Sequence, residues 1–197
     1  MTVPNETPVA VDAADDAAFG FWLSLMSDAI LFGLLFATYA VMVGNTAGGP
    51  GGAALFSLRN LSWQTACLLT STLTMAFATA AAGNGALRRS VLWLGVTAAL
   101  GAGFLVLELQ ELGGLIAAGH GPARSGFLSA FFTLVGTHGL HVAAGLIWTS
   151  VIVVQLLVKG PHPKVMSRLH RLGLFWHFLD IVWIGVLSEV YLAGMVA

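Results

Sequence analysis

Seven carboxylate and imidazole side chains interrupt long apolar stretches of this 197-residue chain. They are Asp28, Glu108, His138, His141, His177, Asp180 and Glu189. Buried groups of these types do three kinds of chemistry. They join helices through hydrogen bonds, they take up and release protons, or they bind a metal or haem. The chemistry of the chain therefore depends on where its helices place these few side chains.

The residue types leave all three interpretations open. A hydrogen-bonded network is the general explanation for polar groups inside a membrane bundle, and carboxylate–histidine chains also recur in proton pumps. His138 and His141 share one helical face, as a metal site needs, but their segment lacks the Glu of a zinc-protease helix. A haem with two axial histidines needs ligands from facing helices, which His141 and His177 could supply. We predict no metal site and no catalytic residue in this chain.

The composition places these groups in a membrane protein. Hydrophobic residues make up 57% of the chain and charged residues only 9%, with a net charge of −1. So few charges cannot cover the surface of a soluble domain, and the balance excludes a disordered chain. Without a basic excess the chain is not expected to bind nucleic acid. The single Cys67 excludes an intrachain disulfide framework.

The apolar runs predict an all-α membrane bundle of five transmembrane helices. An α-helix needs roughly 20 apolar residues to span the hydrocarbon layer. The predicted spans are residues 20–43, 62–82, 91–112, 127–158 and 172–195. Together they form one transmembrane domain, 20–197. Residues 1–19 are acidic and are expected to form a flexible tail.

The basic residues predict how the bundle is oriented. Six lie on the side of the tail: Arg88, Arg89, Lys159, Lys164, Arg168 and Arg171. The other side has only Arg59 and Arg124. Because basic loops stay in the cytoplasm, we expect a cytoplasmic N-terminus and a periplasmic C-terminus.

Depth separates the polar groups that are costly from those that are not. Asp28 and Asp180 each lie about eight residues, roughly 12 Å, inside the cytoplasmic end of their helices. His177 lies one turn shallower than Asp180 on a neighbouring face. Glu108 and Glu189 lie near the opposite ends of their spans, where we expect water or headgroups to solvate them. A buried cluster of Asp28, His177 and Asp180 is therefore predicted, with His138 and His141 as candidate members.

A second group of side chains suits a lipid surface. Basic and aromatic residues surround the start of the last span, where phospholipid headgroups would lie. The candidate headgroup contacts are His162, Lys164, Arg168, His170, Arg171 and Trp176.

Four segments resemble subunit III of the haem–copper oxidases. They are LVGTHGLHV at 134–142, FWHFLDIVW at 175–183, FWLSLMSD at 21–28 with LFATYAV at 35–41, and SGFLSAFF at 125–132. The resemblance covers nearly the whole chain after residue 20. The segments at 21–41 and 125–132 are similar to the quinol-oxidase branch, the cytochrome bo type, and five spans suit that branch.

The resemblance implies a place in a bacterial inner-membrane complex. Such a complex oxidises ubiquinol, reduces oxygen to water and pumps protons. The haems and copper belong to the catalytic subunit I, with subunits II and IV in the same complex. Subunit III carries none of these cofactors and supports assembly, phospholipid binding and durable proton uptake. Asp28 falls where many relatives carry a carbodiimide-reactive Glu. Residues 39–42 depart from the aromatic-His-Ser stretch that helps hold lipid in cytochrome c oxidase relatives.

The histidine count agrees with a non-catalytic subunit. A haem–copper centre with a second haem needs about six histidine ligands. The chain has six in all, and His120, His162 and His170 fall in predicted loops or at helix ends. The alternatives are subunit III of a cytochrome c oxidase, or a free-standing haem-binding or proton-handling membrane protein.

Overall fold

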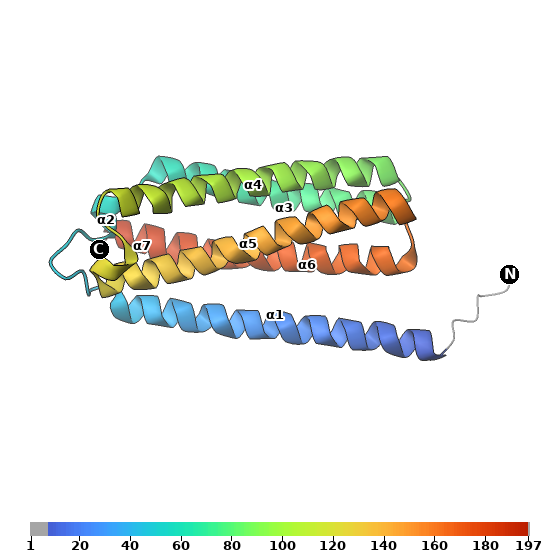
Figure 1. Ribbon diagram of the computed structural model, residues 1–197, viewed down its shortest axis with the longest axis horizontal. Helices are drawn as coiled ribbons and strands as arrows, with labels where there is room; N and C mark the ends of the chain where they lie inside the picture. The colour runs from blue at the N-terminus through green and yellow to red at the C-terminus, as the bar shows by residue number, and fades with distance from the viewer. Residues whose placement is uncertain (1–7, 197) are drawn as a thin grey trace.

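The computed structural model describes residues 8–196, with side chains described from residue 16 to residue 194. This part of the chain contains helices and no strands, so the all-α prediction is confirmed. Figure 1 shows an elongated bundle whose long helices run nearly parallel to the longest axis.

Within residues 8–196, five helices are long and apolar enough to cross a membrane. They are α1 (Pro8–Met42), α3 (Leu58–Gly83), α4 (Leu87–Ala117), α5 (Gly126–Lys159) and α6 (Pro163–Gly185). The last of these continues through a π-helical stretch, η2 (Val186–Leu192), into α7 (Ala193–Val196). Two short elements lie in the connections, α2 (Gly52–Leu55) and the 3-10 turn η1 (Pro122–Arg124).

The first and the last of the five long helices begin earlier than the apolar runs predict. Helix α1 begins at Pro8, so residues 8–19 are helical where a flexible tail was expected; residues 1–7 lie outside the described part. Helix α6 begins at Pro163 rather than at residue 172. Proline suits the first helical position, and the His162 ring nitrogen accepts a hydrogen bond from the Lys164 N–H at 3.4 Å. Helices extend past the hydrocarbon layer wherever caps sustain them, which hydropathy alone does not reveal.

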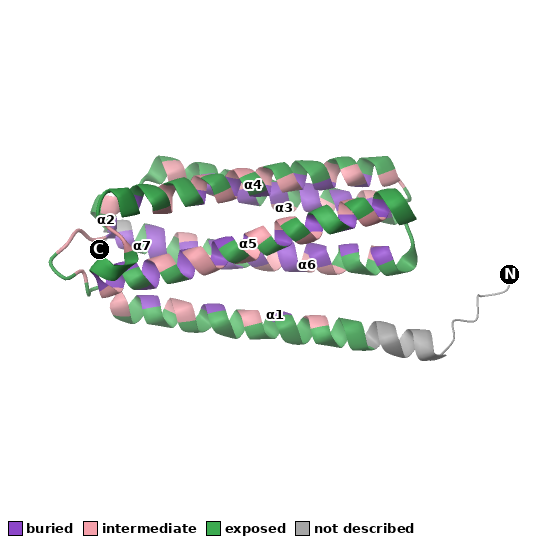
Figure 2. Cartoon of the chain, in the orientation of Figure 1, coloured by how far each residue is buried: buried purple, intermediate pink, exposed green. Residues whose placement is uncertain are grey.

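Helices α3 to α6 pack around the core, while α1 lies along the outside of the bundle. Figure 1 shows α1 running beside α5 and α6, and it contacts only these two long helices extensively. Figure 2 shows that most of α1 is exposed, with a few buried or half-buried positions toward the bundle. Large apolar side chains such as Trp22, Met26 and Ile30 point outward. This face of α1 is suited to lipid or to an apolar protein surface.

Trp176 of α6 anchors the core between three other helices. A Cβ atom added at Gly101 of α4, or at Gly145 of α5, would lie 2.9 Å from the Trp176 ring. The indole N–H donates a hydrogen bond to the Ser71 hydroxyl of α3 at 2.9 Å. Trp176 is only 1% exposed, so the expectation that it contacts lipid headgroups is wrong. The early start of α6 places it two to three turns deeper than predicted.

Candidate functional site: buried carboxylate–histidine pairs

The carboxyl group of Asp28 on α1 faces the imidazole of His141 on α5. The Oδ1 atom of Asp28 lies 3.6 Å from Nε2 of His141. Both side chains remain partly open, at 23% and 20% exposed. The other ring nitrogen of His141, Nδ1, lies 2.8 Å from the Thr137 carbonyl oxygen one turn earlier. Phe32 of α1 packs on the imidazole, with ring centres 5.1 Å apart.

Glu108 and His138 form a second pair, between α4 and α5, in the closed interior. The Oε2 atom of Glu108 lies 3.8 Å from Nδ1 of His138, and the side chains are 2% and 0% exposed. His138 Nε2 lies 3.3 Å from the Leu179 carbonyl oxygen of α6. A Cβ atom at Gly139 would overlap Oε1 of Glu108. The bare glycine backbone therefore provides the space in which the carboxyl group lies.

Aromatic side chains surround the interior pair. The rings of Phe104 and Trp183 lie 5.5 Å and 5.4 Å from the His138 imidazole, and 4.7 Å from each other. The Trp183 indole N–H donates to the Thr65 hydroxyl at 3.1 Å. Neither ring offers the carboxyl group a hydrogen bond, so the aromatic side of the pair is apolar.

The three-residue spacing of His138 and His141 does not make a shared metal site. Each imidazole faces a different carboxyl group, on α4 and on α1. Within the described residues no three His, Cys, Asp or Glu side chains are arranged to hold a metal ion. The two histidines instead connect α5 to helices on two sides.

The predicted cluster of Asp28, His177 and Asp180 is split. Asp180 lies near Thr72, His177 and His138. No ion pair or hydrogen bond among residues 16–194 joins Asp28 to Asp180 or His177. Asp28 instead pairs with His141, because α1 packs along α5 and touches α6 less. Of the two histidines on α5, His138 lies near Asp180, and His141 faces Asp28.

Glu108 is the main residue that sequence reasoning misplaced. It was expected near water or headgroups at the end of its span, yet it is buried. Helix α4 continues to Ala117, nine residues or roughly 13 Å beyond Glu108, so the carboxyl group lies well inside the bundle. The available signal was Gly139, whose missing side chain next to His138 leaves room for a neighbour.

Sequence reasoning also missed the polar contact between Gln64 and Glu111, which lies next to Glu108 in the bundle. The Gln64 amide of α3 donates to Oε2 of Glu111 at 2.7 Å. Glu111 follows Glu108 by one turn of α4 and also interacts with the buried Tyr191 of η2. These side chains continue the polar interior from Glu108 toward the end of α4.

The basic residues predicted to bind headgroups gather at the α5–α6 turn. His162, Lys164, Arg168 and His170 are exposed, and Arg171 is half-buried. Arg168 donates to the Gln155 side-chain oxygen of α5 at 3.1 Å. The turn therefore presents a cationic surface at one end of the bundle.

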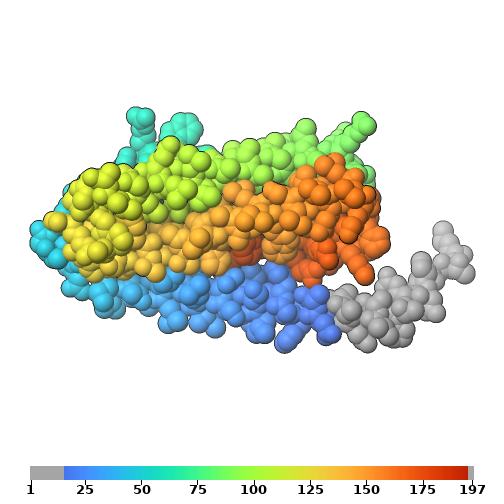
Figure 3. Space-filling view, in the orientation of Figure 1, coloured from blue at the N-terminus to red at the C-terminus, as the bar shows by residue number. Residues whose placement is uncertain are grey.

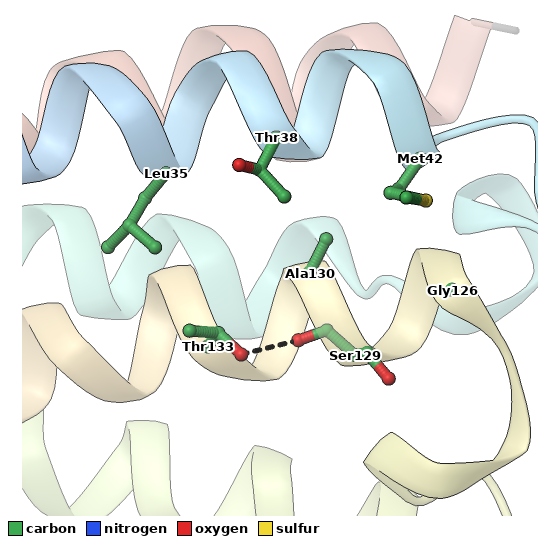
Figure 4. Close-up of a pocket in the computed structure, with 7 residues that line it drawn as sticks. All are labelled: Leu35, Thr38, Met42, Gly126, Ser129, Ala130 and Thr133. Atoms are coloured by element: carbon green, nitrogen blue, oxygen red, sulfur yellow. Dashed lines mark hydrogen bonds between the residues drawn. The ribbon is translucent and has the colours of Figure 1, made fainter.

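An apolar groove of about 210 Å³ lies between α1 and α5 at the other end of the bundle. Figure 4 shows its lining: Leu35, Thr38, Met42, Gly126, Ser129, Ala130 and Thr133. The three hydroxyl groups donate to backbone carbonyl oxygens of Leu34, Pro122 and Ser129. Because their protons are already used, the groove offers few polar contacts. In the space-filling view of Figure 3, α1 lies along the lower edge of α5.

Comparison with known proteins agrees with these features. Residues 9–195 match the family described as cytochrome c oxidase subunit III. The chain is 51% identical to the cytochrome bo(3) ubiquinol oxidase subunit 3 of Pseudomonas aeruginosa, over 94% of this chain and 88% of that one. It is 46% identical to the protein of that name from Buchnera aphidicola, covering 90% and 91%. It is 42% identical to the cytochrome c oxidase subunit 3 of Bacillus sp. PS3, covering 90% and 86%. The chain therefore belongs to the subunit III family of the haem–copper oxidases.

Proposed function

We propose that this chain is the non-catalytic third subunit of a proton-pumping ubiquinol oxidase. The observation that carries the proposal is the order of the similarities. Three relatives named as ubiquinol oxidase subunits come first in this order, at 51%, 50% and 46% identical. A fourth of that name is 38% identical, and two named as quinol oxidase subunits are 39% identical. Those named as cytochrome c oxidase subunits are 42% and 40% identical. The resemblance of residues 21–41 and 125–132 to the quinol branch also favours ubiquinol as the electron donor of the complex.

The geometry of the histidines supports a role without redox chemistry in this chain. A haem iron needs a free imidazole nitrogen from each axial histidine. In His141 one nitrogen faces the Thr137 carbonyl and the other faces Asp28. In His138 the two nitrogens face Leu179 and Glu108. The haems and copper are then held by the catalytic subunit I, in a complex that also contains subunits II and IV.

The role that remains is to support the assembly and durability of the complex. Asp28 and His141 tie the outermost helix to the bundle, and the exposed apolar face of α1 can pack on lipid or a partner subunit. Structural phospholipids fit the start of α6, where Lys164, Arg168 and Arg171 supply positive charges that suit anionic headgroups and His162 and His170 lie beside them.

The orientation proposed is a cytoplasmic N-terminus and a periplasmic C-terminus in the bacterial inner membrane. The α3–α4 turn, with Arg88 and Arg89, lies at the same end of the bundle as the α5–α6 turn with Lys159 and Lys164 (Figure 1). Basic loops concentrate on the cytoplasmic side of membrane proteins. This shared end supports the assignment.

Capture of the native complex tests the proposal. An affinity tag at the C-terminus of this chain, after solubilisation in mild detergent, is expected to retain larger subunits that contain haem and copper. Mass determination of the intact complex should account for those subunits and for bound phospholipid. If the chain is consistently recovered from native membranes without haem-containing partners, the proposed function is wrong.

A further inference from the structure

The interior pair of Glu108 and His138 constrains where protons can be. His138 Nε2 lies within hydrogen-bond distance of the Leu179 carbonyl oxygen, which can only accept. The Nε2 atom therefore carries a hydrogen. The remaining nitrogen, Nδ1, faces Oε2 of Glu108 at 3.8 Å. In a neutral ring of this tautomer, Nδ1 presents a lone pair.

A lone pair and an ionised carboxylate repel each other, and this repulsion is costly between two side chains that are 0% and 2% exposed. If Glu108 is ionised, His138 must be an imidazolium; if His138 is neutral, Glu108 must be a carboxylic acid. Both arrangements place one proton on one of the two facing atoms, Oε2 or Nδ1, which lie 3.8 Å apart. In the first arrangement the two side chains carry opposite charges, and in the second both side chains are neutral.

The surroundings favour the uncharged arrangement. A buried ion pair is stable only when further hydrogen bonds satisfy its charges. Among the described residues, neither Glu108 Oε2 nor His138 Nδ1 has any hydrogen-bond partner. The rings of Phe104 and Trp183 pack against the imidazole and offer its Nδ1 atom no hydrogen bond.

We propose that Glu108 and His138 form a closed proton-binding site. The site holds one proton as a carboxylic acid facing a neutral imidazole, and it keeps this proton while the complex turns over. Three titratable groups face the pair from neighbouring elements: Glu111 of α4, Tyr191 of η2 and Asp180 of α6. The pair joins α4, α5 and α6 without adding net charge to the bundle interior.

The Asp28–His141 pair provides an internal comparison. Its tautomer is fixed in the same way, because His141 Nδ1 faces the Thr137 carbonyl oxygen. Its members are 23% and 20% exposed, whereas Glu108 and His138 are 2% and 0% exposed. The same chemistry is therefore present in an open and a closed form on one helix, and only the open pair can exchange its proton readily.

Infrared spectroscopy of the intact complex tests the closed site. The C=O stretch of a protonated carboxyl group is expected in the wild-type complex, unchanged between pH 6 and pH 9 and slow to shift in D₂O. Glu108→Gln should remove this band, because glutamine has the shape of the acid but no carboxyl group. The matched variant Asp28→Asn should leave it in place. A wild-type spectrum equal to that of Glu108→Gln, or a band that disappears as the pH rises, would overturn the proposal.

Solid-state NMR of the wild-type complex gives a second measurement that needs no folded variant. With ¹⁵N-labelled histidine, one buried ring should show a single protonated nitrogen, Nε2. Its assignment follows from through-space contacts to the Phe104 and Trp183 rings, which lie within 6 Å of His138. An imidazolium signal with the same contacts would contradict the neutral pair.

Discussion

His138 and His141 lie one turn apart on α5, yet the residues around them leave the two imidazoles exposed to different degrees. His138 is fully buried among aromatic rings and faces Glu108, while His141 is partly open and faces Asp28. Both use one ring nitrogen on a backbone carbonyl oxygen. Each imidazole therefore has one nitrogen left for a carboxyl group, and the degree of burial decides how freely that group exchanges a proton.

Replacing Asp28 tests the open pair. We expect Asp28→Ala to leave the initial oxygen-reduction rate of the complex largely intact, because no redox ligand lies in contact with Asp28. Loss of the contact with His141 should weaken the attachment of α1, so assembly or activity over many turnovers should decline. Oxygen uptake measures both quantities, with the exposed Asp16→Ala as control. Immediate and complete loss of activity in a fully assembled complex would contradict this role.

Replacing Gly139 tests the packing of the closed pair. The added methyl group of Gly139→Ala would overlap the Glu108 carboxyl group, which the surrounding rings prevent from moving freely. Overpacking of this kind costs about 1–3 kcal/mol. Thermal denaturation of the complex should show a clear decrease in midpoint temperature. In the control variant Gly136→Ala, no atom lies within 4 Å of the added carbon. Equal stability of the two variants would show that Glu108 does not occupy this space.

Some of these residue positions follow from the sequence and some do not. The sequence allows Asp28 to pair with His141, because both histidines of the 134–142 segment are candidate members of its cluster. The buried position of Glu108 does not follow from the sequence. A hydropathy window ends where polar residues begin, whereas helix α4 continues past them to Ala117. Trp176 was misplaced for the related reason that α6 begins nine residues before its apolar run.

At the scale of elements, the bundle is held together by side chains of one helix inserted at glycines of others. Trp176 of α6 occupies the space left by Gly101 and Gly145, and Phe36 of α1 lies 2.9 Å from where a Cβ of Gly185 would be. The existence and order of the five spans follow from composition, because hydrocarbon thickness sets their minimum length. The helix ends and the contacts between helices depend on caps and on packing, which no single span contains.

Removing the Trp176 side chain tests the central contact between elements. Trp176→Ala deletes a buried ring and its hydrogen bond to Ser71, and changes of this kind cost about 3–5 kcal/mol. The control is Trp63→Ala, whose side chain is 62% exposed. We expect the first variant to lower the thermal midpoint of the complex much more than the second. A similar small effect of both would mean that Trp176 does not anchor the bundle.

At the scale of the whole molecule, the charges have separate places. Basic residues gather at the end of the bundle that holds the α3–α4 and α5–α6 turns. Within the spans, the carboxyl groups of Asp28, Glu108 and Glu111 face histidine or glutamine. Glu189 is an exception that lies exposed near the end of the last span. The sparse charges therefore predict orientation at the ends of the bundle and helix contacts within it.

Accessibility of introduced cysteines tests the orientation. In a Cys67→Ser background, a cysteine replacing Arg124 should react with a membrane-impermeant thiol reagent added to spheroplasts. A cysteine replacing Lys159 should react only after the membrane is permeabilised, because the α5–α6 turn is assigned to the cytoplasm. The reverse labelling pattern would invert the assigned topology.

The most direct test of the central claim compares electron donors for the complex that this chain belongs to. The complex captured through the tagged chain is supplied in turn with a ubiquinol analogue and with reduced cytochrome c, and oxygen uptake is recorded. We expect rapid oxygen uptake with the quinol and almost none with cytochrome c. Oxygen uptake with cytochrome c alone would contradict the assignment to a ubiquinol oxidase.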